Sequence, residues 1–296
     1  MKTAIFYFSG TGNTERVVKT WLDALKSYEI KAESFRIEDE PVTDLNTYDR
    51  IGIAYPIHAF NAPRIVLDFA ELLPAFPERK RIYLIMVSGE PLRLNDSSDQ
   101  KLKKILKGKN AEVESAWHYI MPYNMIFRHT ESRAFQMYET MQKLVPLDVR
   151  RYFIENQLSA LRPIPFTGFV TAAFRIEQWF SSKNGRLYRV TNDCIECMKC
   201  VDSCPVNNIN FKNGKIRFEN RCILCMRCSF GCPKDAIRIG LLNGWRVNKP
   251  YEFREPETEG SDSHKKFCRR SYERYFKGSL ERIQAECERA SERTEV

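Results

Sequence analysis

The sequence lacks the features that carry a chain into or across a membrane. None of its 296 residues belongs to an apolar run near the roughly 18 residues that span a bilayer. The best run, 166–174, is short and lies between Arg162 and Arg175. The apolar run at residues 4–8 is also shorter than the roughly 7–15 residues of a secretory signal. We therefore expect a cytoplasmic protein with no membrane partner.

Signatures of nucleotide binding and of hydrolytic catalysis are also missing. The four histidines are scattered, and no Ser/His/Asp arrangement stands out. The glycine-rich segment near the start has Glu15 where the third glycine of G-x-G-x-x-G belongs, and no G-K-[ST] follows it. NAD and ATP are therefore disfavoured, and the catalytic residues stay unknown. Outside the middle of the chain the charge is nearly balanced, so we expect no nucleic-acid partner.

Cysteine is abundant, with ten in the chain. Because no export signal is present, clustered cysteines indicate metal ligands more than disulfides. Eight of them form two copies of C-x2-C-x2-C-x3-C-P, offset by 28 residues. The first copy comprises Cys194, Cys197, Cys200 and Cys204, and the second Cys222, Cys225, Cys228 and Cys232. Such an internal duplication is a firmer signal than either copy alone.

This spacing predicts two 4Fe–4S clusters, because three cysteines in one tight loop can present their thiolates to one cubane. The surrounding segment 191–240 has eight basic and five acidic residues, a balance that would offset cluster charge. Two alternatives remain at this point. Paired C-x2-C units can hold zinc, and clusters can serve a structural role only.

The segment 190–241 closely resembles bacterial two-cluster ferredoxins. That resemblance implies that the fourth cysteine of each copy binds the cluster of the other copy. The first cluster would then be held by Cys194, Cys197, Cys200 and Cys232. The second would be held by Cys222, Cys225, Cys228 and Cys204.

The first 121 residues alternate between apolar strand-like segments and amphipathic helical ones. The predicted strands are 2–8, 30–37, 50–55, 81–88 and 112–120, and the predicted helices are 13–27, 62–73 and 97–107. This alternation predicts an α/β fold with a doubly wound parallel sheet. We expect helical cover and a connector at 122–190, including helical periodicity over 131–160. The ferredoxin-like domain follows at 191–241, and a linker and an amphipathic C-terminal helix follow at 242–296.

A hydroxyl-rich and glycine-rich loop separates the first strand from the first helix. Glycine lets the backbone wrap closely, and amides at a helix start attract phosphate. The residues are Ser9, Gly10, Thr11, Gly12, Asn13 and Thr14. This loop resembles the phosphate loop of flavodoxins, which implies FMN. The same resemblance implies two loops around the flavin ring, with Tyr55, Pro56 and Phe60 on the first and Ser88 and Gly89 on the second. Alternatively, the fold has lost its flavin, and Tyr55 and Phe60 are core residues.

Together the two halves resemble fused flavodoxin–ferredoxin proteins of anaerobic bacteria. The resemblance implies an electron-transfer iron–sulfur flavoprotein that passes electrons between two 4Fe–4S clusters and FMN. Two other functions stay open: a flavin-dependent reductase of a small acceptor, and a flavin-free redox sensor or structural module. The expected partner is an unidentified redox protein. The apolar stripe of the C-terminal helix either packs within the chain or forms a homodimer.

Overall fold

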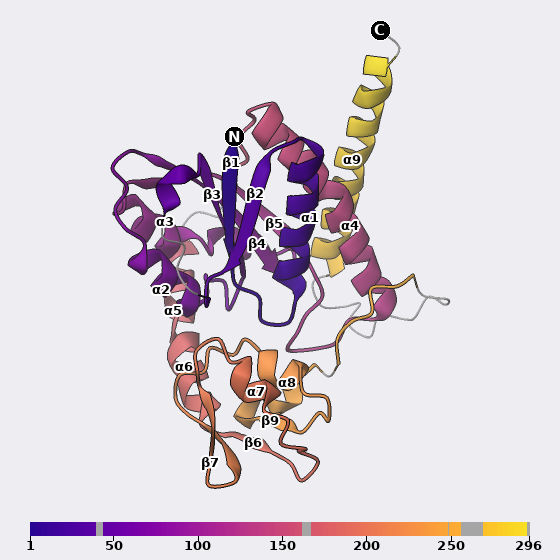
Figure 1. Ribbon diagram of the computed structural model, residues 1–296. Helices are drawn as coiled ribbons and strands as arrows, with labels where there is room; N and C mark the ends of the chain where they lie inside the picture. Colours follow the sequence, from indigo (N-terminus) through magenta and orange to yellow (C-terminus); the bar gives the residue numbers. More distant parts are fainter. Residues whose placement is uncertain (40–43, 162–166, 248, 256–268, 295–296) are drawn as a thin grey trace.

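The computed structural model describes residues 1–39, 44–161, 167–247, 249–255 and 269–294. The chain forms an α/β body with a smaller domain, built around the cysteine repeats, at one end of it (Figure 1). Helix α6 (Ile176–Gly185) runs between the two. Cys268 and most of the predicted linker lie outside the described residues.

The α/β body is built on five parallel strands. These are β1 (Lys2–Tyr7), β2 (Lys31–Arg36), β3 (Arg50–Pro56), β4 (Lys80–Ser88) and β5 (Ala111–Ile120). Their order is β2-β1-β3-β4-β5, which is the flavodoxin-like order of doubly wound sheets. The predicted fold class is therefore confirmed. In such sheets ligands bind beyond the carboxyl ends of the strands, at the point where the strand order reverses.

Helices cover both faces of this sheet. Helices α1 (Asn13–Ser27) and α4 (Glu131–Val149) pack on one face, over a core that includes Trp21 and Tyr83. Helices α2 (Arg64–Leu72) and α3 (Gln100–Lys107) cover the other face, over Ile53 and Leu84. Two short 3-10 turns, Leu45–Thr47 and Arg93–Ser97, precede β3 and α3. Strands β1, β3 and β4 are mostly apolar because both of their faces are buried, whereas the edge strand β2 has no buried residue.

The predicted helical periodicity over 131–160 is wrong at its end. Helix α4 passes into a π turn at Arg150–Ile154, and the chain then leaves the helix. The amide of Ala116 donates to the carbonyl of Ser159 at 2.9 Å, and the amide of Ser159 donates to Ser115 Oγ at 3.1 Å. The backbone near residue 159 therefore supplies hydrogen bonds to the edge strand β5. Beyond residues 162–166, helix α5 (Thr167–Phe174) leads into α6.

The small domain repeats its backbone at the sequence offset of 28. Strands β6 (Tyr188–Val190) and β9 (Ile237–Ile239) pair antiparallel, as do β7 (Ile209–Lys212) and β8 (Lys215–Phe218). Short helices α7 (Lys199–Asp202) and α8 (Arg227–Phe230) occupy equivalent positions. The 3-10 turn Gly240–Trp245 follows β9. The duplication seen in the sequence is thus a duplication of structure.

The C-terminal helix α9 (Arg269–Thr294) packs on α4 within the same chain. Tyr272 is buried, and Tyr275 and Ile283 join the core between α4 and the sheet. The Arg282 guanidinium pairs with Asp148 at 2.5 Å, and Asp148 also accepts a hydrogen bond from Tyr119 at 2.8 Å. This packing favours the intramolecular alternative for the apolar stripe. Among the described residues, no helix is long and apolar enough to cross a membrane.

Candidate functional site

Each cysteine repeat is wound into a tight loop by residues with left-handed backbone. Glu196 and Met198 have φ values of 50° and 58°, and their counterparts Leu224 and Met226 have values of 52° and 63°. Side chains other than glycine adopt this conformation at a cost that the surrounding structure must offset. The same two positions adopt it in both copies, so the strain is a property of the motif. It turns successive thiols toward a common centre.

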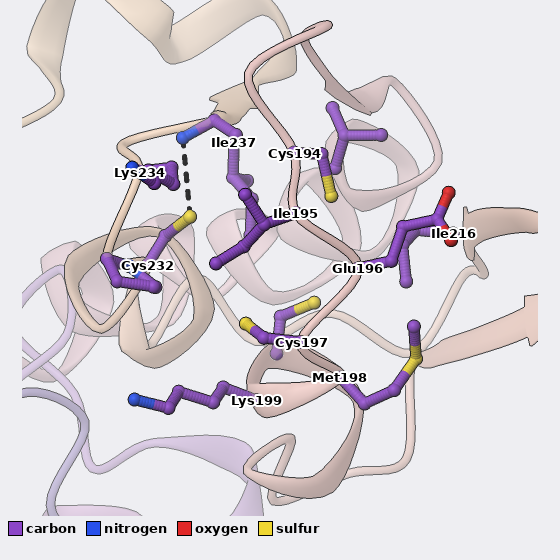
Figure 2. Close-up of a pocket in the computed structure, with 14 residues that line it drawn as sticks. Cys194, Ile195, Glu196, Cys197, Met198, Lys199, Ile216, Cys232, Lys234 and Ile237 are labelled. Atoms are coloured by element: carbon purple, nitrogen blue, oxygen red, sulfur yellow. Dashed lines mark hydrogen bonds between the residues drawn. The ribbon is translucent and has the colours of Figure 1, made fainter.

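Two cavities lie at these centres, and each is lined by four cysteines. The first, which we call the outer cavity, is lined by Cys194, Cys197, Cys200 and Cys232. Figure 2 shows three of these, Cys194, Cys197 and Cys232, around the cavity. The second, the inner cavity, is lined by Cys204, Cys222, Cys225 and Cys228. These are the crossed sets expected from the resemblance, while ligation itself stays a prediction.

The chemistry of both cavities fits iron–sulfur clusters. Backbone amides donate to cysteine sulfur at equivalent places in the two copies, from Asn208 to Cys204 at 3.2 Å and from Ala236 to Cys232 at 3.3 Å. Hydrogen bonds to sulfur are one of the means by which proteins tune cluster potentials. Burial raises the pKa of the Cys225 thiol to about 12. A thiol so placed loses its proton when a metal binds it.

The cavities differ in what surrounds them. At the outer cavity Cys197 is exposed and Ile195 is 56% exposed. At the inner cavity Ile223 is 8% exposed, and both it and Cys225 pack against the core of the α/β body. The outer cavity therefore faces solvent, and the inner cavity faces the other domain.

The loop at residues 9–14, which we call the phosphate loop, is in direct contact with the second cysteine repeat. A Cβ atom added at Gly10 would lie 2.2 Å from the carbonyl oxygen of Cys225 and 3.4 Å from the Cys225 Cβ. No real side chain fits at such distances, so glycine is required here for close approach of the two backbones. Sequence reasoning explained Gly10 by phosphate binding and did not foresee this second role.

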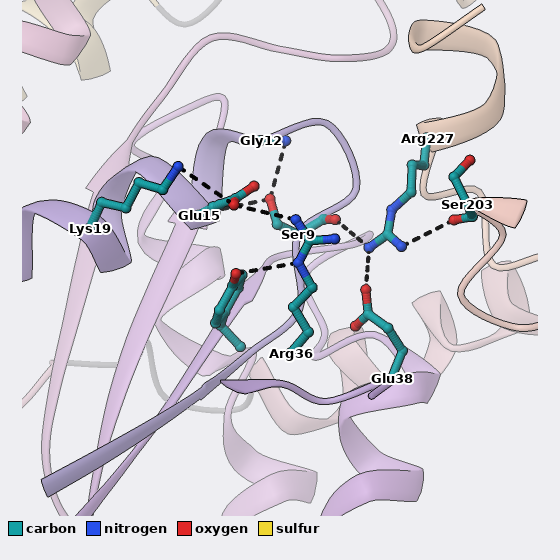
Figure 3. A network of polar contacts seen from close by, with 9 residues as sticks. Ser9, Gly12, Glu15, Lys19, Arg36, Glu38, Ser203 and Arg227 are labelled. Atoms are coloured by element: carbon teal, nitrogen blue, oxygen red, sulfur yellow. Dashed lines mark hydrogen bonds and ion pairs between the residues drawn. The ribbon is translucent and has the colours of Figure 1, made fainter. Parts of the chain in front are cut away.

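Arg227, a residue of the second cysteine repeat, forms hydrogen bonds across the contact between this repeat and the phosphate loop (Figure 3). Its Nη2 donates to the carbonyl oxygen of Ser9 at 2.7 Å and to Glu38 Oε1 at 2.5 Å. Its Nη1 donates to the carbonyl oxygen of Ser203 at 3.1 Å. One guanidinium thus joins the phosphate loop, the segment after β2 and the first cysteine repeat. The sequence predicts no specific role for Arg227, because an arginine that bonds to another domain and one that only faces solvent look alike in the sequence.

The loop at residues 9–14 has the features of a phosphate cradle. Helix α1 begins after Gly12, whose φ is 97°, and Ser9 Oγ accepts hydrogen bonds from the Gly12 amide at 3.1 Å and from the Glu15 amide at 3.3 Å. The first amides of a helix have no partners inside it and favour anions. Thr11 Oγ1 is buried without a hydrogen-bond partner. Asn13 holds the loop in place by donating from Nδ2 to the carbonyl oxygen of Pro122 at 2.8 Å. A phosphate monoester would accept a hydrogen bond from the unpartnered Thr11 hydroxyl.

The Arg16 side chain places a positive charge beside this loop, and the sequence did not predict it. A Cβ atom at Gly12 would lie 2.7 Å from Arg16 Nη1, so the Arg16 side chain folds back over the loop. The guanidinium also lies 4.7 Å from the centre of the Phe253 ring. Burial is the main cause that lowers the pKa of Arg16. The only sequence signal was its position, one helical turn after Gly12.

The first predicted ring loop, 55–61, is not arranged as expected. Tyr55 is fully buried in the core of the α/β body, and burial raises its pKa well above the ordinary value. This position does not fit the predicted stacking role, because a flavin ring cannot reach the Tyr55 side chain. Pro56 ends β3 and is half-buried. Phe60 has a φ of 62° and packs edge-on against Phe174 of α5 at 5.0 Å.

The second predicted ring loop, 88–95, is held from two sides. Ser88 Oγ donates to the carbonyl oxygen of Glu90 at 2.7 Å. A Cβ atom at Gly89 would lie 2.5 Å from the Tyr123 ring, and the Gly89 carbonyl accepts a hydrogen bond from Tyr272 Oη of α9 at 2.5 Å. Tyr123 and Tyr272 are therefore the aromatic residues at this loop. The segment after β5 and the C-terminal helix supply them, and the predicted loop residues Ser88 and Gly89 lie beside them.

Comparison with known proteins identifies a family for one part of the chain. Residues 193–237 match the family of 4Fe-4S dicluster domains, so the small domain is a dicluster domain with two 4Fe–4S clusters. No curated protein matches the chain. Oxidised flavodoxin 1 from Bacillus cereus is 16% identical, with a TM-score of 0.36 over 50% of this chain and 98% of its own. The two-electron reduced flavodoxin of Megasphaera elsdenii is 21% identical, with a TM-score of 0.34 over 49% of this chain and 98% of its own.

Proposed function

We propose that this protein is an electron-transfer iron–sulfur flavoprotein that passes electrons between its two 4Fe–4S clusters and an FMN bound at residues 9–14. Clusters supply single-electron chemistry, and a flavin can exchange one electron or two. The observation that carries the proposal is the contact of Gly10 with the Cys225 carbonyl. Electron transfer falls steeply with distance, and this contact supports a short path between the phosphate loop and the inner cavity.

The surroundings of the two cavities support an order for the transfer. Cys197 at the outer cavity is exposed, so a redox partner can approach there. The inner cavity is lined by residues of the small domain, and two of them, Ile223 and Cys225, pack against the core of the α/β body. The proposed path therefore runs from the partner to the outer cavity, then to the inner cavity and then to the flavin, or in reverse.

The proposed FMN phosphate site comprises the amides at the start of α1, the Thr11 hydroxyl and the Arg16 guanidinium. Thr11 Oγ1 would donate to a phosphate oxygen, and Arg16 would offset the phosphate charge. Arg227, bonded to the Ser9 carbonyl, would keep the loop against the inner cysteine repeat. We keep Phe60, Ser88 and Gly89 as candidates for the ring environment.

Anaerobic purification followed by iron, flavin and spectral analysis tests this proposal. We expect about eight iron atoms per chain, bound FMN, and visible absorption from both that bleaches on reduction. Stopped-flow reduction should then show flavin bleaching that follows cluster bleaching. The matched variant Thr11→Val should lose FMN and keep its iron. Intact clusters without flavin, even after FMN is added, would contradict the proposal and favour the sensor or structural alternative.

A further inference from the structure

Helices α5 and α6 expose a group of large apolar side chains that line neither cavity. The exposed fractions are 84% for Phe169, 44% for Phe174, 69% for Ile176 and 62% for Trp179. Single exposed apolar residues are ordinary, but a contiguous group marks a binding surface. We call this group the α5–α6 face. Neither the metal centres nor the phosphate loop makes use of it.

The charged side chains of this segment are mainly positive. Between residues 167 and 187 the sequence has one acidic residue, Glu177. Its carboxylate accepts a hydrogen bond from Ser181, which is 1% exposed, so the only negative charge is turned toward the protein. Lys183 and Arg186 are exposed, and the Lys183 ammonium lies 5.8 Å from the centre of the Trp179 ring. The outward side of α6 therefore combines apolar and cationic groups.

A second cationic element adjoins this face. Thr167 at the start of α5 bonds to Ser97 through their hydroxyls at 2.6 Å, and a Cβ atom at Gly168 would lie 3.0 Å from Gln100 of α3. Helix α3 carries the lysine run of the sequence, and its Lys104 and Lys107 are exposed. Figure 1 shows α3 and α5 on the same flank of the molecule. The charge of Lys103 is offset by Asp99, which lies 2.6 Å away. The lysine run of α3 nevertheless adds positive charge to this flank.

We propose that the α5–α6 face binds reversibly to the surface of an anionic phospholipid membrane. Exposed tryptophan and phenylalanine rings are favoured at the interface between membrane and water, and neighbouring lysine or arginine side chains are attracted to anionic headgroups. Phe169 and Trp179 would enter that region, and Lys183 and the lysines of α3 would contact lipid phosphates. We expected no membrane partner because the sequence has no membrane-spanning run and no secretory signal. This mode of binding needs neither.

Charge also argues against a second copy of the chain as the occupant. A twofold contact through this face would place the same cations of both copies opposite each other. Such like charges repel, and the one carboxylate of the segment is turned inward. An anionic lipid surface meets both the apolar and the cationic side chains.

Vesicle flotation with the purified, cluster-loaded protein tests the proposal. One set of vesicles is pure phosphatidylcholine, and the other is phosphatidylcholine mixed with phosphatidylglycerol. We expect the protein to float with the mixed vesicles, to stay behind with the neutral ones, and to detach as salt is raised. The double variant Phe169→Ser/Trp179→Ser should lose flotation. Leu72→Ser, which removes an 85% exposed leucine from α2, is the matched control and should float normally.

Charge reversal tests the cationic half of the proposal. The variant Lys104→Glu/Lys183→Glu should reduce partition onto the mixed vesicles by about tenfold or more. Cluster absorbance of each variant shows that it has folded. Equal flotation with neutral vesicles, or none with either set, would overturn the proposal. So would a concentration-dependent dimer in analytical ultracentrifugation that Trp179→Glu abolishes, since it would assign the face to a second copy.

Discussion

In the first cysteine repeat Ile195 is 56% exposed, whereas its counterpart Ile223 in the second repeat is 8% exposed. Met198 and Met226 differ in the same direction, the first half-buried and the second 3% exposed. The backbone nevertheless winds in the same way in both, with left-handed residues at equivalent positions. The motif thus dictates the loop, and the neighbouring domain dictates its environment.

The third pair of equivalent residues shows what this difference means for function. Lys199 in the first repeat is exposed. Its counterpart Arg227 joins Ser9, Glu38 and Ser203. A planar guanidinium can donate several hydrogen bonds in fixed directions, and a lysine cannot replace it there. One repeat is therefore adapted to contact other molecules, and the other to contact the α/β body.

The largest expected difference between the repeats follows from removing one cysteine of each. Cys197→Ser and Cys225→Ser should each lower the iron content from about eight to about four atoms per chain. Only Cys225→Ser should also weaken FMN binding, by about tenfold, because its backbone supports Gly10. Iron analysis and fluorescence titration with FMN measure both effects. Equal loss of FMN in the two variants would mean that the repeats do not differ as described.

Arg227→Ala should destabilise the protein by about 2 kcal/mol or more, because it removes charged hydrogen bonds and leaves the Glu38 carboxylate buried. Lys199→Ala at the equivalent exposed position should stay within about 0.5 kcal/mol of the wild type. Anaerobic thermal unfolding compares them. The rate of flavin bleaching after cluster reduction should fall in Arg227→Ala only. An unchanged rate of flavin bleaching in Arg227→Ala would show that Arg227 does not contribute to electron transfer between the two domains.

Gly10→Ala should destabilise by about 1–3 kcal/mol, the usual cost of overpacking, since the added methyl would overlap the Cys225 carbonyl. It should also slow flavin bleaching by moving the two loops apart. Gly244→Ala is the control, because a Cβ atom there meets nothing within 4 Å. The contact that carries the proposed function would be dispensable if both variants behaved alike.

The smallest effect concerns His58, which lies at the second repeat. Burial lowers its pKa, against the opposing influence of Glu177 and of a hydrogen bond with the Ile223 backbone. A histidine with a lowered pKa stays neutral in the folded protein while the unfolded chain takes up a proton below about pH 6.5. Stability should therefore fall as the pH falls, by at most about 1.4 kcal/mol per pH unit.

The control for this prediction is His58→Gln, which keeps a polar side chain and does not titrate. Its unfolding should be less sensitive to acid than that of the wild type in the range below pH 6.5. Parallel pH profiles of the two proteins would show that His58 does not titrate on unfolding.

Local patterns predicted much of the fold. The strands and helices of residues 1–121 follow from apolar runs and 3.6-residue periodicity, and the repeat at Cys194 and Cys222 predicted a duplicated structure. The prediction failed near Ser159, where periodicity indicated helix and the edge strand β5 bound the backbone instead. The predicted stacking of Tyr55 on the flavin ring also failed. An aromatic residue at the end of a strand gives the same sequence pattern whether its side chain faces a ligand or the core.

The sequence by itself determined the two cysteine loops and the phosphate loop, because spacing and glycine content constrain the backbone within a few residues. Only the tertiary structure decided which repeat is enclosed, that Gly10 lies against Cys225, and that Arg227 bonds to Ser9. These contacts join residues about 200 positions apart. They depend on how two domains pack together, and no local pattern encodes that packing.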